Sequence, residues 1–414
     1  MTSLGVGDRG PAGLNQVLIV GGGPAGMMAG LLLARAGVTV KVLEKHADFF
    51  RDFRGDTVHP STMEILDQLG MLERFLRRPH DRLDSARIRI AGREWAIGDL
   101  SHLDTAAPFI AMMPQWEFLD FLRDEAAAFP GFSLAMEQPV AGLVEEGKRI
   151  VGVRLADGTE ERASQLVIAA DGRASLARSL DLLTVETFGA PMDVFWFRLP
   201  RTSQGGDALR GSIENKRMVV LIGRDTYWQT AYLIPKGEAE TTRARGMGWL
   251  RSEVQKAFPD LDLSNDVLKS PEELHLLTVA VDRLVEWHRP GLLAIGDAAH
   301  AMSPIGGIGI NLAIQDAVAA ANILSRPLAR KAPVDHLLDK VQERRLLPTR
   351  MIQAAQIAAQ NRVIGRVLGE EGPIVRAPLI VRLLDRCALL RRIPGRFIGL
   401  GIRRERVRSP NAFV

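Results

Sequence analysis

Cysteine and tyrosine are scarce in this sequence of 414 residues, which holds one cysteine, Cys387, and two tyrosines. A single cysteine excludes an internal disulfide, so the fold depends on packing or on a bound ligand and suits the cytoplasm. The chain has no CxxC pair and no cluster with zinc-ligand spacing, so no metal site is predicted. Heptads, repeats and aromatic RNA-binding spacings are missing too, which argues against nucleic acid as a partner.

Long hydrophobic runs are also scarce, with one exception at residues 17–34, VLIVGGGPAGMMAGLLLA. Its eighteen uncharged residues approach the length of a membrane span. Glycines and a proline stand near its front, however, and its pattern changes from that of a strand to that of a helix. We therefore interpret the run as a buried strand, a turn and a helix.

Acidic residues are few in one region only. Residues 366–414 contain eleven arginines against four acidic residues, a local charge of +7 in a chain whose formal net charge is +4. The first 365 residues therefore carry a net charge of −3. The basic character of the chain belongs to its C-terminal region.

A βαβ unit lies at the start of the ordered pattern. Residues 17–20 form an apolar run typical of a buried strand, residues 24–36 have helical character, and residues 38–44 form a second strand. The right-handed crossover of such a unit makes its two strands parallel. The sequence therefore predicts a Rossmann-like parallel sheet.

The turn of this unit carries the motif GxGxxG. Gly21 allows a tight turn, Gly23 lets the backbone approach a pyrophosphate, and Gly26 lets helix and strand pack closely. Glu44 ends the second strand, where a carboxylate accepts hydrogen bonds from a ribose. Motif, strand, helix and terminal acid together predict a dinucleotide site. The alternative, a glycine turn needed only for packing, leaves Glu44 unexplained.

A second glycine-rich segment, GDAAHAMSPIGGIGIN at residues 296–311, distinguishes FAD from a nicotinamide dinucleotide. Asp297 follows a buried strand and is placed to hold a ribityl hydroxyl. Gly306, Gly307 and Gly309 bring backbone amides and the positive end of the following helix beside a flavin ring, where they stabilise negative charge. FAD is therefore the predicted cofactor.

Three motifs in this order resemble the flavoprotein aromatic hydroxylases, the single-component FAD monooxygenases typified by para-hydroxybenzoate hydroxylase. They are GGGPAG at residues 21–26, AADGRASLAR at residues 169–178, and the segment at residues 296–311. The likeness spans about residues 16–345. It implies hydride transfer from NAD(P)H to FAD, reaction of the reduced flavin with O2 at carbon C4a, and hydroxylation of an aromatic or other electron-rich small molecule by the resulting hydroperoxide. A flavin dehydrogenase or reductase on the same fold, and a non-catalytic lipid-carrying escort protein, are the alternatives.

The expected fold is α/β, with a Rossmann-like FAD-binding domain, an inserted and mainly antiparallel sheet that binds substrate, and a helical C-terminal region. The expected FAD-binding domain comprises residues 15–80, 104–182 and 286–345, the substrate domain residues 81–103 and 183–285, and the basic helical region residues 346–414.

The resemblance also assigns roles to individual residues. It implies that Asp171 belongs to a motif associated with FAD and NAD(P)H, that Gln115 contacts the ribityl or phosphate region, and that Ile310 and Asn311 contact the pyrimidine side of the flavin. Pro304, near the reacting edge of the ring, and Arg54, near the ring and pyrophosphate, are the predicted catalytic residues. The complete set of predicted FAD contacts is Gly21, Gly23, Ala25, Gly26, Glu44, Lys45, Arg54, Gln115, Asp171, Asp297, Pro304, Gly307, Gly309, Ile310 and Asn311.

Structural alternatives apply to several of these residues: Asp171 as a strand-to-turn residue, Arg54 in a surface ion pair, and Gln115 as a helix-start residue. His300 lies inside the third motif, and we expect it to orient the turn by hydrogen bonding rather than to act as an acid or base.

Aromatic residues in the second sheet are the candidate substrate contacts. Both tyrosines, Tyr227 and Tyr232, fall in one predicted strand together with Gln229. Strand alternation places Tyr227 and Gln229 on one face and Tyr232 on the other. All three residues are candidates, although aromatic residues in a sheet belong more often to a core.

The C-terminal segment PLIVRLLDRCALLRR, from Pro378, predicts an amphipathic helix with arginines beside an apolar face. Ile380, Leu383, Leu384, Cys387 and Leu390 form that face. We consider four roles for it: contact with an anionic membrane surface, a lipophilic entry route for a hydrophobic substrate, docking on the protein's own domain, and contact with a second subunit in a homodimer.

Overall fold

The computed structural model describes residues 14–50, 57–201, 209–214, 216–224, 226–264, 266–368 and 376–414. A parallel sheet forms the centre of one half of the molecule, in the strand order β19-β20-β11-β1-β2-β8. Its strands are β1 (Asn15–Val20), β2 (Val40–Leu43), β8 (Phe132–Ala135), β11 (Glu160–Ala169), β19 (His288–Arg289) and β20 (Leu292–Ala294). All neighbours in this order are parallel except β19 and β20. The predicted βαβ unit is confirmed, because β1 pairs with β2 in parallel.

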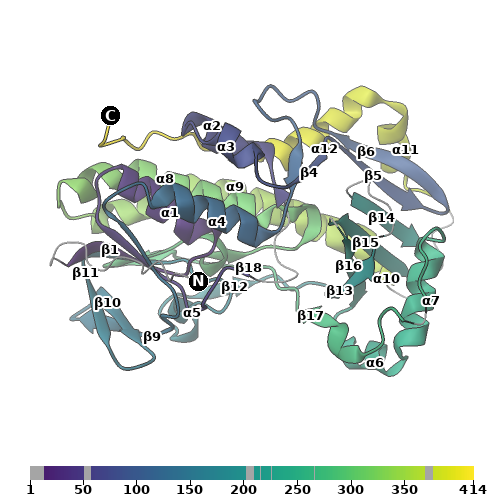
Figure 1. Ribbon diagram of the computed structural model, residues 1–414, viewed down its shortest axis with the longest axis horizontal. Coiled ribbons are helices and arrows are strands. Elements are labelled where there is room, and N and C mark those ends of the chain that lie inside the picture. Colours follow the sequence, from purple (N-terminus) through teal and green to yellow (C-terminus); the bar gives the residue numbers. More distant parts are fainter. Residues whose placement is uncertain are drawn as a thin grey trace, which may run out of the picture.

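Long helices cover this sheet, as Figure 1 shows. They are α1 (Pro24–Arg35), α4 (Gln115–Ala126), α8 (Gly309–Ala329) and α9 (Leu338–Ala359). The apolar residues of β1 and α1 are almost all buried, as expected for a strand covered on both faces and the helix packed against it. The run at residues 17–34 is thus a strand, a turn and a helix in the core. The segment Ile305–Ala329, which contains α8, has the length and hydropathy of a membrane span. Because 72% of its most apolar stretch is buried inside the protein, α8 is a core helix.

The sequence at residues 150–172 predicts a hairpin that turns at Asp157 and Gly158, and this hairpin extends the first sheet. Strands β9 (Val140–Glu146) and β10 (Arg149–Leu155) are antiparallel to each other, and β10 is antiparallel to β11. The apolar spacing from Ser61 to Leu76 predicts one helix, but the structure has two, α2 (Pro60–Gln68) and α3 (Leu72–Leu76). The break lies at Gly70, whose φ of 69° is left-handed and ends the first helix.

A second sheet of seven strands lies at the other end of the molecule (Figure 1), in the order β17-β13-β16-β15-β14-β5-β6. Its strands are β5 (Ser85–Ile90), β6 (Arg93–Asp99), β13 (Met192–Pro200), β14 (Leu209–Glu214), β15 (Arg217–Gly223), β16 (Tyr227–Pro235) and β17 (His275–Leu277). Only the β5–β14 pair is parallel. Helices α6 (Ala239–Ala244) and α7 (Met247–Ala257) pack on one face of this sheet. The α/β fold with an additional, mainly antiparallel sheet is therefore confirmed.

Two three-stranded sheets complete the strands. One contains β12 (Val185–Thr187), β18 (Asp282–Leu284) and β21 (His300–Ala301), and the other contains β3 (Thr57–Val58), β4 (Asp81–Leu83) and β7 (Ile110–Met112). Residues expected in the substrate domain thus pair with residues expected in the FAD domain: β18 with β21, and β4 with β7. The short helix α5 (Leu176–Ser179) follows β11.

The C-terminal region is helical only in part. A π-helix (Gln360–Ile364) and α10 (Gly365–Leu368) follow α9, and α11 (Leu379–Arg386) and α12 (Ala388–Leu400) come later. The single tail helix predicted from Pro378 was wrong, because Cys387 has extended dihedral angles and separates α11 from α12. Residues 401–414 form an extended segment that runs back over the FAD half and pairs at Ala412 with Arg35.

Candidate cofactor and substrate site

Four strands of the first sheet end at the same edge. β1, β2, β11 and β20 are mutually parallel, so the segments that follow them emerge together. Those segments carry Gly21, Asp171 and Asp297, one from each of the three sequence motifs, and Glu44. In open α/β sheets this edge is where ligands bind.

The glycines of the first motif are needed for different reasons. Gly21 has a φ of 102°, and a Cβ there would lie 2.5 Å from the carbonyl oxygen of Ala170, so the first and second motifs touch. A Cβ on Gly26 would collide with the carbonyl oxygen of Gly21. Gly23 has open space around its missing side chain, at the start of α1. The third motif joins the same cluster, because a Cβ on Gly296 would lie 3.0 Å from that of Ala25.

Glu44 supports the glycine turn from below. One carboxylate oxygen accepts a hydrogen bond from the amide of Gly22 at 2.8 Å, and the other accepts one from the amide of His46 at 3.1 Å. Its side chain is buried, whereas Lys45 is exposed. The predicted contact of Glu44 with a ribose stays a prediction, and the turn gives this acid a second, structural task.

Asp171 is a partly buried carboxylate with one buried oxygen. Its Oδ2 accepts a hydrogen bond from the amide of Leu176 at 2.9 Å, in the first turn of α5. Its Oδ1 is buried and has no hydrogen-bond partner among the described residues. Burial raises the pKa of Asp171 above its usual range, against the lowering effects of the nearby Ser175 side chain and of the Leu176 amide. An unpaired buried oxygen beside the glycine turn suits a hydroxyl of a bound cofactor.

Arg173 belongs to this edge, although the sequence analysis did not single it out. Its Nε lies 3.3 Å from Oδ2 of Asp297, and its Nη2 donates to the carbonyl of Met302 at 2.9 Å. Its Nη1 is buried without a partner in the described part of the chain. The only signal for Arg173 was its place inside the second motif, between Asp171 and Ser175. Asp297, predicted to hold a ribityl hydroxyl, thus uses one oxygen to fix this arginine.

The last residue of the second motif, Arg178, joins it to the third. Its Nη1 lies 2.8 Å from Oδ1 of Asp282, and its Nε donates to the carbonyl of Ala298 at 2.8 Å. The side chain of Arg178 is largely buried. Arg178 therefore uses its guanidinium to fix the turn after β20.

The third motif forms a glycine loop ahead of α8. Pro304 precedes a single 3₁₀ turn (Ile305–Gly307), and Gly306 and Gly307 have φ values of 77° and 61°. A Cβ on Gly307 would meet the side chain of Thr57, whose hydroxyl donates to the Gly307 carbonyl at 2.9 Å. Helix α8 begins at Gly309, so the positive end of its dipole lies at this loop.

The side chain of Asn311 is hydrogen-bonded within the protein, and its predicted contact with the flavin stays a prediction. Its Oδ1 accepts hydrogen bonds from the amide of His59 and the hydroxyl of Thr62, both at 2.8 Å. Its Nδ2 donates to the carbonyls of Thr57 and Gly307, both at 3.3 Å. Because its side chain is committed on both sides, Asn311 positions the loop, and a flavin contact at this residue falls to its backbone.

The remaining predicted contacts lie as follows. Gln115 is the first residue of α4 and is half-buried. Ile310 is half-buried in the first turn of α8. Arg54 lies outside the described residues.

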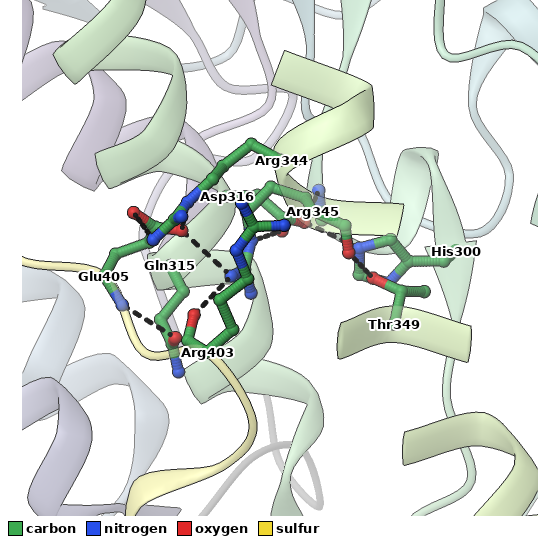
Figure 2. Close-up of polar contacts among 9 residues, drawn as sticks. His300, Gln315, Asp316, Arg344, Arg345, Thr349, Arg403 and Glu405 are labelled. Atoms are coloured by element: carbon green, nitrogen blue, oxygen red, sulfur yellow. Dashed lines mark hydrogen bonds and ion pairs between the residues drawn. The ribbon is translucent and has the colours of Figure 1, made fainter. Parts of the chain in front are cut away.

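His300 takes part in a buried ionic network, shown in Figure 2. Its Nε2 lies 2.6 Å from Oδ2 of Asp316 on α8, and Oδ1 of Asp316 accepts from Nε of Arg345 on α9 at 2.9 Å. Arg345 also lies 3.2 Å from Glu405, which in turn pairs with Arg344 at 2.7 Å. Burial opposes the ionisation of Asp316, but the charges and hydrogen bonds of His300 and Arg345 outweigh it and lower the pKa of Asp316. The expectation that His300 orients the motif by hydrogen bonding is confirmed.

The second sheet presents an apolar face that reaches the third motif. Ala231 and Leu233 of β16 and Val194 of β13 share an apolar cluster with Trp196 and with Ile305, the residue after Pro304. Within the described residues, the indole Nε1 of Trp196 is buried and has no hydrogen-bond partner. Trp196 thus places one hydrogen-bond donor, its indole N–H, in an otherwise apolar cluster beside the glycine loop.

The three candidate substrate residues lie on different sides of the second sheet. Tyr232 packs in the cluster beneath α7, 6.1 Å from the ring of Trp249, and burial raises its pKa. Its prediction as a substrate contact was wrong, because α6 and α7 cover that face. Gln229 lies on the opposite face and accepts hydrogen bonds from Arg224. Tyr227 lies under the guanidinium of Arg198.

The residues at the sheet edge fit FAD. The open space at Gly23 and the unpaired buried atoms of Asp171 and Arg173 call for a polar ligand, and the second glycine loop lies opposite. Both ends of a dinucleotide thus meet groups of suitable chemistry. The geometry defines a flavoprotein of the class with an added substrate sheet.

The comparisons with known proteins agree. The model of the FAD binding domain family matches residues 15–355, and the chain therefore belongs to this family of FAD-dependent aromatic monooxygenases, with FAD as cofactor. The chain is 33% identical to 6-methylpretetramide 4-monooxygenase from Streptomyces rimosus over 387 residues, which cover 91% of each chain. It is 31% identical to rifampicin monooxygenase from Streptomyces venezuelae over 73% of this chain and 62% of that one.

Solved structures share the fold at lower identity. The anhydrotetracycline hydroxylase OxyS from Streptomyces rimosus matches with a TM-score of 0.70 and 22% identity, covering 94% of this chain and 76% of that chain. The Diels-Alderase PyrE3 of pyrroindomycin biosynthesis matches with a TM-score of 0.71 and 22% identity, covering 93% and 80%. Such a likeness establishes the fold, and its members carry names from more than one kind of chemistry.

Proposed function

We propose that this enzyme hydroxylates a fused-ring aromatic compound, using NAD(P)H as reductant and O2 as oxidant. In the balanced reaction one oxygen atom enters a C–H bond of the substrate, the other leaves as water, and NAD(P)H with one proton supplies two electrons. Bound FAD would supply the redox chemistry, while the protein binds the cofactor and the substrate, orients them and excludes water. The name of the relative with 33% identity, which acts on 6-methylpretetramide, supports a fused-ring substrate.

The observation that carries the proposal is the apolar face around Trp196, beside the loop of Pro304. An aromatic substrate fits between this face and the flavin, with the unpaired Nε1–H of Trp196 donating to a ring oxygen. Burial of that N–H without a partner has a cost that the substrate would relieve. The amides around Gly307 and Gly309 would hold negative charge on the flavin pyrimidine, at the positive end of α8.

Other residues of the sheet edge would hold the cofactor. Gly21 and Gly23 would lie against the pyrophosphate, Glu44 beside the adenosine ribose, and Asp171 and Asp297 beside hydroxyl groups. Arg54 stays a predicted catalytic residue near the ring.

The test is a screen of phenolic and fused-ring compounds for substrate-stimulated NAD(P)H oxidation, with O2 uptake and the fate of 18O2 measured together. We expect 18O in the product. NAD(P)H oxidation or substrate dehydrogenation without 18O transfer would favour the dehydrogenase alternative, and a colourless protein that cannot be reconstituted with FAD would contradict both.

Trp196→Phe keeps the ring and removes the donor. We expect KM to rise about tenfold, the value of one neutral hydrogen bond of about 1.4 kcal/mol, with the flavin spectrum unchanged. Tyr232→Phe, on the helix-covered face, is the matched control and should leave KM unchanged. Equal effects of the two substitutions would place the substrate elsewhere.

A further inference from the structure

Helices α11 and α12 form an outward surface with five exposed apolar side chains. They pack on β6, the edge strand of the second sheet, at one corner of the molecule (Figure 1). The exposed side chains are Leu379, Ile380 and Leu383 on α11 and Leu389 and Ile393 on α12. Leu389 and Ile393 are 65% and 66% exposed. A concentration of exposed apolar side chains within fifteen residues marks an interaction surface.

The opposite sides of these helices are already used. Val381 packs with Ile90 and Trp95, and a carboxylate oxygen of Asp385 accepts from the amide of Ala96 at 3.1 Å. Gly395 lies so close to β6 that a Cβ would collide with the carbonyl of Asp99. The helices are therefore firmly docked on their own sheet, and the five apolar side chains face away from it. Docking on the protein's own domain was one of the alternatives in the sequence analysis. Because this docking uses only the inward sides of α11 and α12, their outward side can still bind another partner.

The same surface is strongly basic. Arg382, Arg386, Arg392 and Arg396 are exposed, and Asp385, the one acidic residue between positions 376 and 396, is engaged by Arg93 and by the amide of Ala96. A second carboxylate, Asp99 at the end of β6, lies near enough to Arg392 for their charges to interact. Spacing places Leu389, Ile393 and Arg396 on one face of α12, because positions i, i+4 and i+7 coincide on a helix.

Arg396 leads from this apolar stripe into a cavity of about 510 Å³ at the end of α12. The cavity is lined by Arg344, Arg396, Arg403, Arg404, Arg406 and Arg408, together with Glu405. Two carboxylates oppose these arginines: Glu405 pairs with Arg344 at 2.7 Å, and Glu64 pairs with Arg404 at 2.8 Å. Six guanidinium groups against two carboxylates leave a strong positive excess, which suits phosphate groups.

We propose that this surface binds an anionic lipid bilayer, with the five apolar side chains in the headgroup–acyl boundary and the arginine-lined cavity on lipid phosphates. An apolar stripe flanked by arginines is the pattern of an interfacial helix pair. A second copy of the chain fits less well, because a twofold contact through this surface would bring arginines against arginines. The proposal does not depend on the proposed reaction.

The test is cosedimentation of the FAD-loaded, full-length protein with vesicles. We expect binding to mixed phosphatidylcholine–phosphatidylglycerol vesicles, at least about tenfold weaker binding to phosphatidylcholine alone, and loss of binding at high salt. The double substitution Leu389→Gln and Ile393→Gln should weaken binding at least about tenfold, as should Arg392→Gln with Arg396→Gln, with flavin spectrum and turnover in solution unchanged.

Leu180 and Val285 supply a control. They are exposed apolar side chains that follow α5 and β18, away from α11, α12 and the arginine-lined cavity, so Leu180→Gln with Val285→Gln should leave vesicle binding unchanged. Equal binding to neutral vesicles, no binding at all, or equal losses in control and test variants would overturn the proposal. So would a dimer that Leu389→Gln and Ile393→Gln dissociate, or pyrophosphate binding lost in Arg396→Gln without any vesicle binding.

Discussion

Asp171 and Asp316 are two aspartates of the FAD half with opposite environments. In the part of the chain that the structure describes, Oδ1 of Asp171 is buried without a hydrogen-bond partner, and the pKa of Asp171 is raised because burial dominates. Asp316 is held by Arg345, His300 and the amide of Gly296, and its pKa is lowered. The difference teaches where to look for a ligand: the satisfied carboxylate holds the fold together, and the half-satisfied one awaits a partner.

Removal of Arg345 should have the largest effect. Arg345→Met leaves Asp316 buried without its arginine partner, and we expect the apoprotein to lose about 3–5 kcal/mol of unfolding free energy in urea. Arg344→Met is the matched control, since Arg344 pairs with the same Glu405 but is 32% exposed, and it should cost less than about 1 kcal/mol. Similar losses for the two neighbours would show that the network does not stabilise the fold as described.

His59 adds its own pH dependence to the free energy of unfolding, so variants of the two aspartates are best compared above about pH 6.5. Burial lowers the pKa of His59 to about 4, although its Nδ1 contacts the carbonyl of Ile398. A histidine whose pKa is depressed on folding contributes stability that is present above about pH 6.5 and is lost as the pH falls towards 4, here up to about 3 kcal/mol. Urea unfolding of the apoprotein at several pH values should show this loss.

His59→Gln should flatten the curve between pH 6.5 and 4, because no group at this position then gains a proton in the unfolded chain. His336→Gln, at an exposed histidine, is the control and should leave the curve unchanged. An unchanged slope in His59→Gln would contradict the buried, neutral histidine.

Gly23→Ala should separate cofactor binding from folding. The methyl group meets open space in the protein, so the apoprotein should keep its stability within about 0.5 kcal/mol. Because the glycine turn faces the expected pyrophosphate, the Kd for FAD should rise at least about tenfold, or about 1.4 kcal/mol, measured by flavin fluorescence quenching. Gly142→Ala on β9, where a Cβ makes ordinary contacts, should change neither quantity. A Gly23→Ala protein with unchanged FAD affinity would remove the pyrophosphate from this turn.

Asp171→Asn should have a small effect on stability, but the sign of this effect is informative. A raised pKa means that the charged carboxylate is disfavoured in the fold, and this penalty grows as the pH rises above about 4. The variant apoprotein should therefore be more stable than the parent at pH 7 by about 1 kcal/mol, and FAD affinity should fall. Asp316→Asn should destabilise at the same pH. A destabilised Asp171→Asn apoprotein would show that both aspartates serve the fold.

Much of the FAD half could be predicted from the sequence because its signals are local. The strand, the glycine turn and the terminal acid lie within residues 15–44, and parallel pairing then fixes where they meet. The break at Gly70 and the split at Cys387 were missed, since apolar spacing continues across both positions. A left-handed glycine or an extended residue interrupts a helix without changing the hydrophobic pattern.

The rest of the site depends on contacts between distant segments, which one sequence does not reveal. Asn311 has the spacing of a ligand residue, but its amide is used by residues 250 positions away. Arg345 reads as a surface arginine on a helix, yet it is fully buried against Asp316. Tyr232 and Trp196 could not be told apart until the helices covering one face of the sheet were placed.

The extended segment that follows α12 has a consequence for how the protein is made. Glu405 is the second carboxylate partner of Arg345, and the amide of Ala412 donates to the carbonyl of Arg35 at the end of α1, so α1 and α9 are completed by residues that are translated after them. A nascent chain that has emerged only as far as α9 can pair Arg345 with Asp316 but lacks Glu405, its second carboxylate partner. We therefore expect the last step in closing the flavin half to follow the synthesis of Glu405.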